Sequence, residues 1–248
     1  MQAFADHFSR LSTTYAAYRP RYPERLLAAV AAASPDREVV WDCATGTGQA
    51  ALGLAAHFAT VLASDASREQ VRAAPRHERI RYLVARAEAV PLRSRSVGLV
   101  TVAQALHWLD LPEFYAEARR VLRPGGTLVA WTYGRQRVDA GPLDGVVDDF
   151  YHRVIGPYWS PERRWVETGY RTLPFPFEEI SMEVPPMVAR WSLAELLGYI
   201  GTWSAVALCR EATGRDPLPE LAARLLPLWG DPSTVRTGEW PIGVRAGR

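Results

Sequence analysis

The sequence predicts an α/β protein with a doubly wound, mostly parallel seven-stranded sheet and a helical cap. Short apolar runs alternate with helical stretches over residues 36–134, which is typical of βαβ units with helices on both faces of a sheet. Two glycines, Gly46 and Gly48, come directly after the first apolar run. The residues Arg-Pro-Gly-Gly at 123–126 end a helical stretch just before the fifth run.

The first part of the chain supplies most of the predicted sheet. Residues 1–35 are expected to be helical, because Leu26, Leu27 and Val30 recur at helical spacing. The next apolar run is a buried strand that stops at Asp42. The predicted strands lie at 39–42, 61–65, 80–85, 97–103 and 127–132, and the helices between them at 49–57, 67–74 and 112–122.

After residue 134 this alternation ends, and the chain becomes mostly helical. Further helices are predicted at 142–156, 192–210 and 218–229, with strands at Phe177–Val184 and Val235–Val244. We expect a single domain over residues 1–248. Its predicted parts are an N-terminal helical cap (1–35), a cofactor-binding core (36–134), a helical cap with one strand (135–230) and a closing strand (231–248).

Composition excludes several classes of function. The chain has 248 residues, of which 48% are hydrophobic and 23% charged, as expected of a globular domain. All 29 basic residues are arginine, which excludes a Schiff-base lysine and a phosphate-binding Gly-Lys-Ser/Thr loop. The formal net charge of +2 provides no basic stripe for nucleic acid. We find neither a signal peptide's apolar segment nor a membrane span, so we expect a soluble protein.

The cysteines and histidines argue against metal and disulfide chemistry. Cys43 and Cys209 are too few for a disulfide framework or a cysteine-based zinc site, and this pattern fits a reducing cytoplasm. His57, His77 and His152 sit at no metal-ligand spacing. We therefore expect a cytoplasmic protein without a metal, without nucleic-acid or membrane partners, and either monomeric or weakly dimeric.

The segment from Trp41 to Gln49 carries the predicted site. Gly46 and Gly48 let the backbone turn with positive φ and approach a ligand closely. The following helix offers free N–H groups, and ligands of such sheets lie beyond the carboxyl ends of the strands. Asp65 ends the second strand nineteen residues after Gly46, where its carboxylate can accept both hydroxyl protons of a ribose.

Two nucleoside cofactors satisfy this pattern. Gly46-x-Gly48-x-x-Ala51 matches the dinucleotide fingerprint, with Asp65 in the position of an NAD ribose partner. Asp42 favours S-adenosylmethionine (SAM) instead, because an anion there would repel a pyrophosphate but attract an ammonium or sulfonium. Spacing alone favours SAM and leaves an NAD-dependent oxidoreductase open.

Several segments together resemble the trans-aconitate methyltransferase-like branch of the class I SAM-dependent methyltransferases. The matching motifs are Tyr15-Ala-Ala-Tyr18-Arg19-Pro20-Arg21-Tyr22-Pro23, Asp42-Cys-Ala-Thr-Gly46-Thr-Gly48-Gln49, Ala87-Glu88-Ala89-Val90-Pro91, Gln104-Ala105-Leu106-His107-Trp108 and Leu122-Arg123-Pro124-Gly125-Gly126. Cys43 and Ala44 depart from the pattern, because an apolar or small residue followed by Gly is more common there. The resemblance implies a Rossmann-like methyltransferase fold, with SAM as methyl donor and S-adenosylhomocysteine as product.

The resemblance also implies roles for individual residues. Gly46 and Gly48 would pass under the methionine part of SAM, with Asp42 near its ammonium, and Asp65 would bind the ribose diol. The other implied cofactor contacts are Tyr15, Arg19, Ala44, Gln49, Ala66, Ala87, Glu88 and Gln104. The acceptor-side candidates are Tyr18, His107 and Trp108. As an alternative, Asp42 and Asp65 could simply cap the helices that follow them.

The expected reaction moves a methyl group to a carboxylate or hydroxyl of a small molecule. Because the sulfonium is already activated, the protein mainly aligns nucleophile, methyl and sulfur. A carboxylate acceptor needs no base, whereas an alcohol or phenol does, and His107 is the candidate catalytic base. The alternatives are a packed or capping role for His107 and, for the whole chain, an NAD-dependent oxidoreductase or a non-catalytic SAM-binding module.

Overall fold

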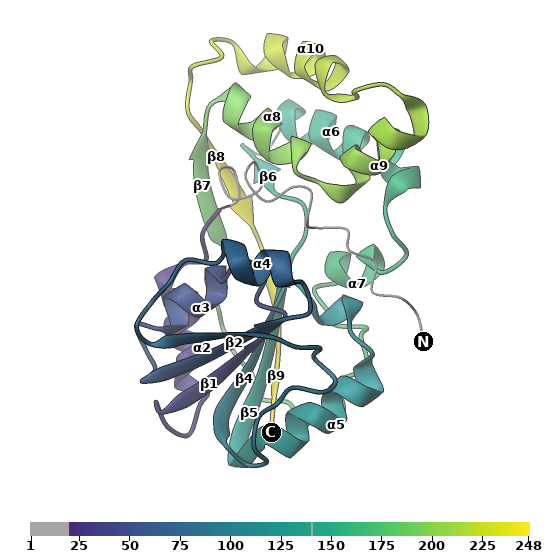
Figure 1. Cartoon of the computed structure of the whole chain (residues 1–248). Helices are drawn as coiled ribbons and strands as arrows, with labels where there is room; N and C mark the ends of the chain where they lie inside the picture. Colours follow the sequence, from purple (N-terminus) through teal and green to yellow (C-terminus); the bar gives the residue numbers. More distant parts are fainter. Residues whose placement is uncertain (1–19, 140) are drawn as a thin grey trace. The chain divides into compact units, whose positions relative to one another are not determined.

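The computed structural model describes residues 20–139 and 141–248 (Figure 1). These residues divide into two compact units, which we call the sheet unit and the helical unit. The sheet unit comprises 21–134, 164–186 and 241–248, and the helical unit comprises Pro20, 135–163 and 187–240, residue 140 excepted. Three separate stretches of the chain therefore build the sheet unit, which holds the described part of the predicted site.

The sheet unit is built on six strands in the order β3-β2-β1-β4-β5-β9 (Figure 1). Neighbouring strands are parallel, except that β9 runs antiparallel to β5. The strands are β1 (Val39–Cys43), β2 (Thr60–Asp65), β3 (Ile80–Val84), β4 (Val97–Ala103), β5 (Leu122–Tyr133) and β9 (Ile242–Gly247). The strand order reverses between β1 and β4, and ligands of such sheets bind at the carboxyl ends beside this point.

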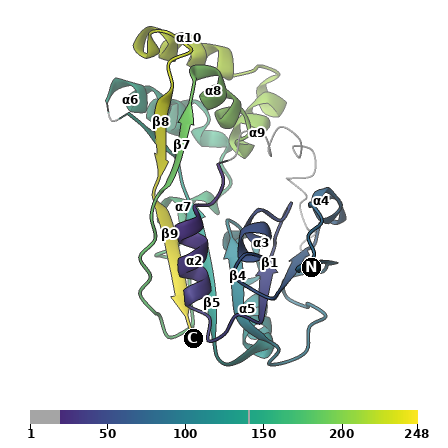
Figure 2. The same ribbon diagram turned by 90° about the vertical axis from the view of Figure 1, so that its left-hand side faces the viewer.

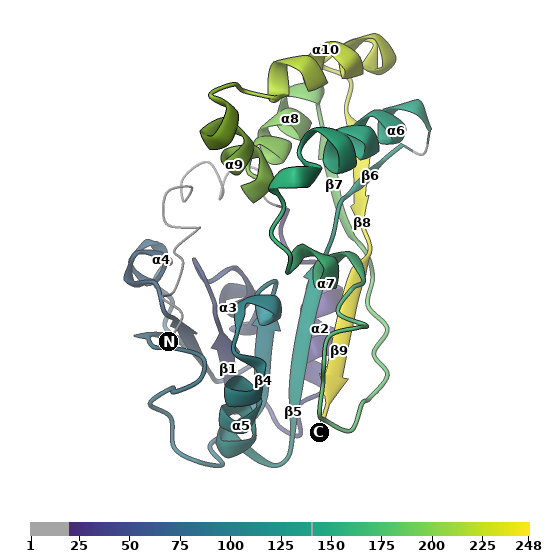
Figure 3. The same ribbon diagram turned by 90° about the vertical axis from the view of Figure 1, so that its right-hand side faces the viewer.

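Helices cover both faces of this sheet (Figure 2, Figure 3). The helices of this unit are α2 (Glu24–Ala32), α3 (Gln49–Leu54), α4 (Arg68–Ala73), η2 (Leu106–Trp108), α5 (Leu111–Val121) and, from Arg164 on, α7 (Arg163–Glu167). On one face α2 packs against α3, where a Cβ at Gly53 would lie 2.0 Å from Leu27 Cδ1, so a larger residue there would require the Leu27 side chain to move. On the other face Phe114 of α5 packs against Trp41 of β1, with ring centroids 6.2 Å apart.

The helical unit combines a small antiparallel sheet with short helices. Its elements are β6 (Arg137–Val138), α6 (Pro142–Asp149), the π-helix η3 (Phe150–Val154), η4 (Gly156–Tyr158), β7 (Met187–Trp191), α8 (Leu193–Gly201), α9 (Ser204–Thr213), α10 (Leu218–Trp229) and β8 (Arg236–Trp240). The sheet order is β6-β8-β7. A capping box of Ser192 and Glu195 begins α8. Inside the unit, Trp240 Nε1 donates to the Tyr199 hydroxyl at 2.9 Å, and both rings are buried.

The fold class is confirmed, but the described sheet has six strands rather than seven. The strand predicted at Phe177–Val184 is wrong, because this segment forms only a single bridge, between Glu179 and Gly247. Prolines at 174, 176, 185 and 186 flank it, and proline has no N–H for a ladder. The predicted closing strand is divided by Pro241 into β8 and β9.

The helix predicted at 192–210 is divided into α8 and α9 by Thr202 and Trp203. Three elements of the helical unit, β6, β7 and η4, were not predicted, because their apolar residues do not recur with the spacing of a strand or a helix. In the described ranges, no helix has both the length and the apolar composition for a membrane crossing. Whether the two units act as the single predicted domain stays a prediction.

Candidate functional site

The loop between β1 and α3 places three alternate residues in the left-handed region. Ala44, Gly46 and Gly48 have φ angles of +53°, +58° and +83°. A Cβ at Gly48 would lie 2.4 Å from the Tyr82 hydroxyl oxygen, so a side chain does not fit there. A Cβ at Gly46 would come no nearer than 3.9 Å to a described neighbour, Gln70 Oε1. The loop is therefore tightly packed at Gly48 and open at Gly46, where a ligand can approach the backbone.

Asp42 lies in β1 directly before this loop and is fully buried. The Thr45 hydroxyl donates to its Oδ2, and the Thr101 hydroxyl of β4 donates to its Oδ1 at 2.8 Å. Burial raises the pKa of Asp42 to about 6, although the two threonine hydrogen bonds lower it, and the charge of Asp65 raises it further. The negative charge of Asp42 is therefore unfavourable unless a cation compensates it.

Asp65, at the end of β2, ties the glycine loop to the next connection. Its Oδ2 accepts a hydrogen bond from the Gly46 N–H at 2.9 Å, and its Oδ1 accepts one from the Ser67 N–H at 2.8 Å. Asp65 is not a helix cap, because the Ser67 side chain caps α4, so the capping alternative is wrong for this residue. The Asp42 carboxylate does accept a hydrogen bond from the backbone of Ala51 in the first turn of α3, so capping is part of what Asp42 does.

The loop after β3 carries the adenine-side candidates Ala87 and Glu88. Ala87 is buried, and the Glu88 carboxylate accepts from the Asp110 N–H at 3.2 Å and pairs with Arg86 at 3.3 Å. An ion pair on α5 fixes the same loop, since Glu117 accepts from the Val90 N–H at 2.8 Å. Its partner Arg120 donates to the Val90 and Leu92 carbonyls at 3.1 and 2.7 Å. The Asp110 N–H and Arg86 thus hold the Glu88 carboxylate, while Glu117 and Arg120 hold the backbone of the loop that follows it.

Gln104 follows β4 with a φ of +58°, which is unusual for a residue with a side chain. Its Nε2 donates to the Tyr133 carbonyl at 2.9 Å, and the Thr132 hydroxyl donates to its Oε1. The end of β5 therefore holds both atoms of this amide.

His107 lies in η2, just beyond the carboxyl end of β4, and is only 9% exposed. Its Nδ1 lies 2.8 Å from the hydroxyl oxygen of Tyr170, a fully buried residue in the returning segment 164–186. The neighbouring Trp108 is 40% exposed, with its ring centroid 4.8 Å from that of His107. The structure thus pairs the candidate base with a tyrosine that sequence reasoning did not single out.

Of the remaining candidates, the structure describes two and leaves three outside its described residues. Gln49 is the first residue of α3, and Ala66 directly follows β2. Tyr15, Tyr18 and Arg19 lie outside the described residues. No group of three His, Cys, Asp or Glu in the described ranges could hold a metal ion.

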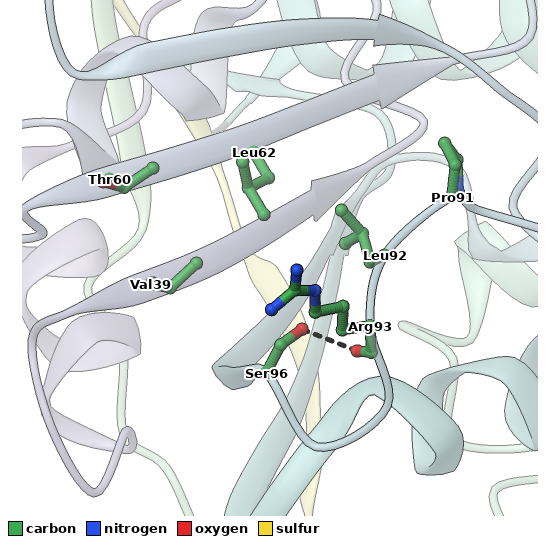
Figure 4. Close-up of a pocket in the computed structure, with 7 residues that line it drawn as sticks. All are labelled: Val39, Thr60, Leu62, Pro91, Leu92, Arg93 and Ser96. Atoms are coloured by element: carbon green, nitrogen blue, oxygen red, sulfur yellow. Dashed lines mark hydrogen bonds between the residues drawn. The ribbon is translucent and has the colours of Figure 1, made fainter.

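A groove of about 340 Å³ lies elsewhere on the sheet unit (Figure 4). It is lined by Val39, Thr60, Leu62, Pro91, Leu92, Arg93 and Ser96. Because Val39 and Thr60 are the first residues of β1 and β2, the groove lies toward the amino ends of these strands. It is therefore separate from the glycine loop.

Comparison with known proteins identifies the family. The model of the methyltransferase domain family matches residues 41–130. A protein of Dictyostelium discoideum named as a methyltransferase is 34% identical over 226 residues, which cover 90% of this chain and 86% of the relative. A solved structure from Anaeromyxobacter dehalogenans, described as a type II methyltransferase, is 49% identical. It covers 93% of this chain and 98% of its own, with a TM-score of 0.86.

The chain belongs to the SAM-dependent methyltransferase family. SAM is therefore its cofactor, which decides against the NAD alternative that spacing left open. A methyltransferase structure from an antibiotic biosynthesis pathway of Anabaena variabilis shares the fold, at 18% identity and a TM-score of 0.58. It covers 96% of this methyltransferase and 100% of its own chain.

The described residues of the methyltransferase fit SAM. The backbone is open at Gly46, and Asp42 is a buried carboxylate that a nearby cation would stabilise. Sequence reasoning missed Thr101 and Tyr82, which fix Asp42 and Gly48. Thr101 did give a signal, as a hydroxyl residue inside the otherwise apolar strand β4, whereas Tyr170 gave none.

Proposed function

We propose that this methyltransferase moves the methyl group of SAM to a carboxylate or hydroxyl of a small molecule, as in the trans-aconitate methyltransferase-like branch. One observation carries the proposal: His107, a buried imidazole hydrogen-bonded to Tyr170, follows β4 at the sheet edge that also bears the glycine loop. An imidazole at this edge can accept the proton of a hydroxyl acceptor, which a site that only binds SAM does not need.

The residues at this edge would hold SAM in a fixed orientation. The Gly46 backbone and the Asp42 carboxylate would lie near the methionine ammonium, and Asp65 would accept from the ribose hydroxyls. The side chains assigned to the adenine side are Ala66, Ala87 and Glu88. Ala44, Gly48, Gln49 and Gln104 would shape the wall along the methionine chain. Tyr15, Tyr18 and Arg19 stay candidates from the sequence motif alone.

SAM supplies a methyl group on a positively charged sulfur. The chain's own part is to align the acceptor oxygen in line with that bond and to exclude water. A carboxylate acceptor attacks without losing a proton. A hydroxyl acceptor passes its proton to His107, and such general-base catalysis contributes about 10²–10⁴-fold.

The test is methyl transfer by the full chain with SAM and either trans-aconitate or a panel of simple phenols, followed by mass spectrometry. Mild alkali then distinguishes the products, because it cleaves a methyl ester but not a methyl ether. His107→Gln should abolish methylation of a phenol and leave methylation of a carboxylate nearly unchanged. His77→Gln, a change at an exposed histidine, is the matched control.

Two results would contradict the proposal. Binding of S-adenosylhomocysteine without any methylated carboxylate or hydroxyl would favour the non-catalytic module. Equal loss of both activities in His107→Gln would mean that the imidazole shapes the site rather than accepting a proton. A cytoplasmic location and a monomeric or weakly dimeric state belong to the same proposal, on composition alone.

A further inference from the structure

We propose that Tyr170 is a positioning residue that fixes a single tautomer of His107 through its hydrogen bond to Nδ1. The base role of His107 requires the tyrosine oxygen to accept the Nδ1–H, which leaves the lone pair on Nε2. The inference deepens the proposed function and rests on it, because a defined Nε2 lone pair matters only if His107 receives a proton. Tyr170 lies 63 residues after His107 in the sequence, in a segment that no motif covers.

The contact between His107 and Tyr170 is short and buried from solvent. His107 Nδ1 and the Tyr170 hydroxyl oxygen are 2.8 Å apart, and their ring centroids are 5.8 Å apart. Tyr170 has no exposed surface, and His107 has 9%. In such surroundings a hydrogen bond is stronger than in water, so it can fix which nitrogen of a neutral imidazole carries the proton.

Tyr170 follows the glycine stop of α7. Gly169 and Tyr170 both have left-handed φ angles, +60° and +64°, and their N–H groups donate to the Val166 and Trp165 carbonyls at 3.0 and 2.8 Å. Gly169 packs directly on β9, where a Cβ at Gly243 would lie 2.4 Å from the Gly169 Cα. A left-handed conformation costs a residue with a side chain about 1–2 kcal/mol. The glycine pair lets the turn press against β9, and Tyr170 bears the strain.

Arg245 of β9 holds this turn in place. Its Nη1 donates to the carbonyl oxygens of Tyr170 and Leu173 at 2.8 and 3.0 Å. Its Nε and Nη2 pair with the Glu179 carboxylate at 2.9 and 2.7 Å. The arginine side chain is 11% exposed and the Glu179 side chain 56%, so the bonds to the carbonyl oxygens are the better shielded ones. A left-handed turn anchored by Arg245 thus sets the position of the hydroxyl that meets His107.

The tautomer decides what His107 can do. If Nδ1–H donates to the tyrosine oxygen, Nε2 has a lone pair and can take the acceptor's hydroxyl proton while the oxygen's electron pair forms the bond to the methyl carbon. The carbon–sulfur bonding pair then stays on sulfur, which gives neutral S-adenosylhomocysteine and a protonated imidazole. If the tyrosine donates instead, Nε2 carries hydrogen and cannot act as a base.

The experiment reads the tautomer directly, by long-range proton–nitrogen NMR of the ¹⁵N-labelled full chain. The His107 signals are assigned by their loss in His107→Gln or, if that variant does not fold, by single replacement of His7, His57, His77 and His152. We expect a protonated Nδ1 and an unprotonated Nε2 in the unmodified protein. Tyr170→Phe should convert this pattern to a mixture or to the opposite tautomer.

Tyr115→Phe is the matched control. The Tyr115 hydroxyl is also buried and donates to the Pro174 carbonyl at 2.6 Å, in the same returning segment, without touching His107. It should leave the tautomer unchanged. With a phenol acceptor, Tyr170→Phe should lower kcat by about tenfold or more at an unchanged KM, and Tyr115→Phe should not.

Two results overturn the inference: a protonated Nε2 in the unmodified protein, or a tautomer that Tyr170→Phe does not change. Neither depends on turnover. Failure of the proposed function is a separate result, because it would appear as bound S-adenosylhomocysteine without methylation of any hydroxyl or carboxylate, whichever tautomer the spectra show.

Discussion

The carboxyl ends of β1 and β2 and the carboxyl end of β4 form their sites in opposite ways. At the first, Asp42, the glycine loop and Asp65 lie within 24 consecutive residues and contact one another directly. At the second, His107 depends on Tyr170, and Tyr170 depends on Arg245, each far away in the sequence. The cofactor side is thus local in sequence, while the candidate catalytic side is assembled by tertiary structure.

The two ends also differ in the interactions that lower or raise the stability of the fold. The β1–β2 end holds a buried carboxylate and left-handed residues, which lower stability and which a bound cofactor can offset. The β4 end holds a hydrogen-bonded histidine and tyrosine, and Arg245 anchors the turn that carries the tyrosine. Substitutions at the first end should therefore change cofactor affinity most, and substitutions at the second should change stability or turnover.

Gly48→Ala should have the largest effect. The new Cβ would be strained at a φ of +83° and would lie 2.4 Å from the Tyr82 hydroxyl. Left-handed strain plus overpacking should lower the free energy of unfolding by about 3–4 kcal/mol and abolish S-adenosylhomocysteine binding. Urea unfolding and calorimetry measure the two effects.

Gly125→Ala separates strain from crowding. Gly125 is equally left-handed, with a φ of +74°, but a Cβ there meets nothing within 4 Å of its described surroundings. It should cost only about 1–2 kcal/mol and leave binding intact. Equal losses in the two variants would show that Tyr82 does not restrict the loop.

Asp42→Asn should change the pH dependence of stability and decrease affinity. Burial raises the pKa of Asp42 from 3.8 to about 6, so the folded state binds the proton more tightly and loses stability as pH rises from about 4 through 6. Between pH 4 and pH 8 the free energy of unfolding of the variant should rise by roughly 3 kcal/mol relative to that of the unmodified protein. The asparagine NH2 cannot accept, so one of the two threonine hydrogen bonds is lost at every pH. Its affinity for SAM should fall most at pH 8, where Asp42 of the unmodified protein is ionised, and least near pH 4, where Asp42 is protonated.

Asp144→Asn should change stability with pH in the opposite direction to Asp42→Asn. Burial raises the pKa of Asp144, but hydrogen bonds and charge from Arg135 outweigh it and leave that pKa below its ordinary value. The asparagine variant should therefore lose stability at pH 8, and the difference should disappear as the pH falls below 4. Parallel pH profiles for both variants would refute the account of Asp42.

Arg245→Met should lower the stability of the β4 end without changing cofactor affinity. It removes the donors to the Tyr170 and Leu173 carbonyls, and we expect a loss of about 2 kcal/mol in urea unfolding. Glu179→Gln, which removes only the more exposed ion-pair partner, should cost less than about 1 kcal/mol. S-adenosylhomocysteine affinity should stay unchanged in both, and a large fall in Arg245→Met would break the division between the two ends.

The same division explains how much the sequence predicted. The bounds of β4 were predicted without error, and the glycine loop and Asp65 were found because turn residues and apolar runs are local signals. The segment after residue 176 was predicted as a strand because its apolar pattern fits one, but the flanking prolines limit its pairing to a single bridge. Tyr170 could not be found, since its contact depends on where β9 places Gly243 and Arg245.

Ala44→Gly should have the smallest effect and tests the local end most finely. Ala44 has a left-handed φ of +53°, a conformation that glycine adopts without strain. Glycine relieves about 1–2 kcal/mol of left-handed strain but gains freedom in the unfolded chain, so the net gain should be about 0.5 kcal/mol. Repeated urea titrations resolve this when compared with Ala59→Gly, an exposed alanine without that strain. A loss of stability in Ala44→Gly would mean that the methyl group packs in the loop and that the strain is already compensated.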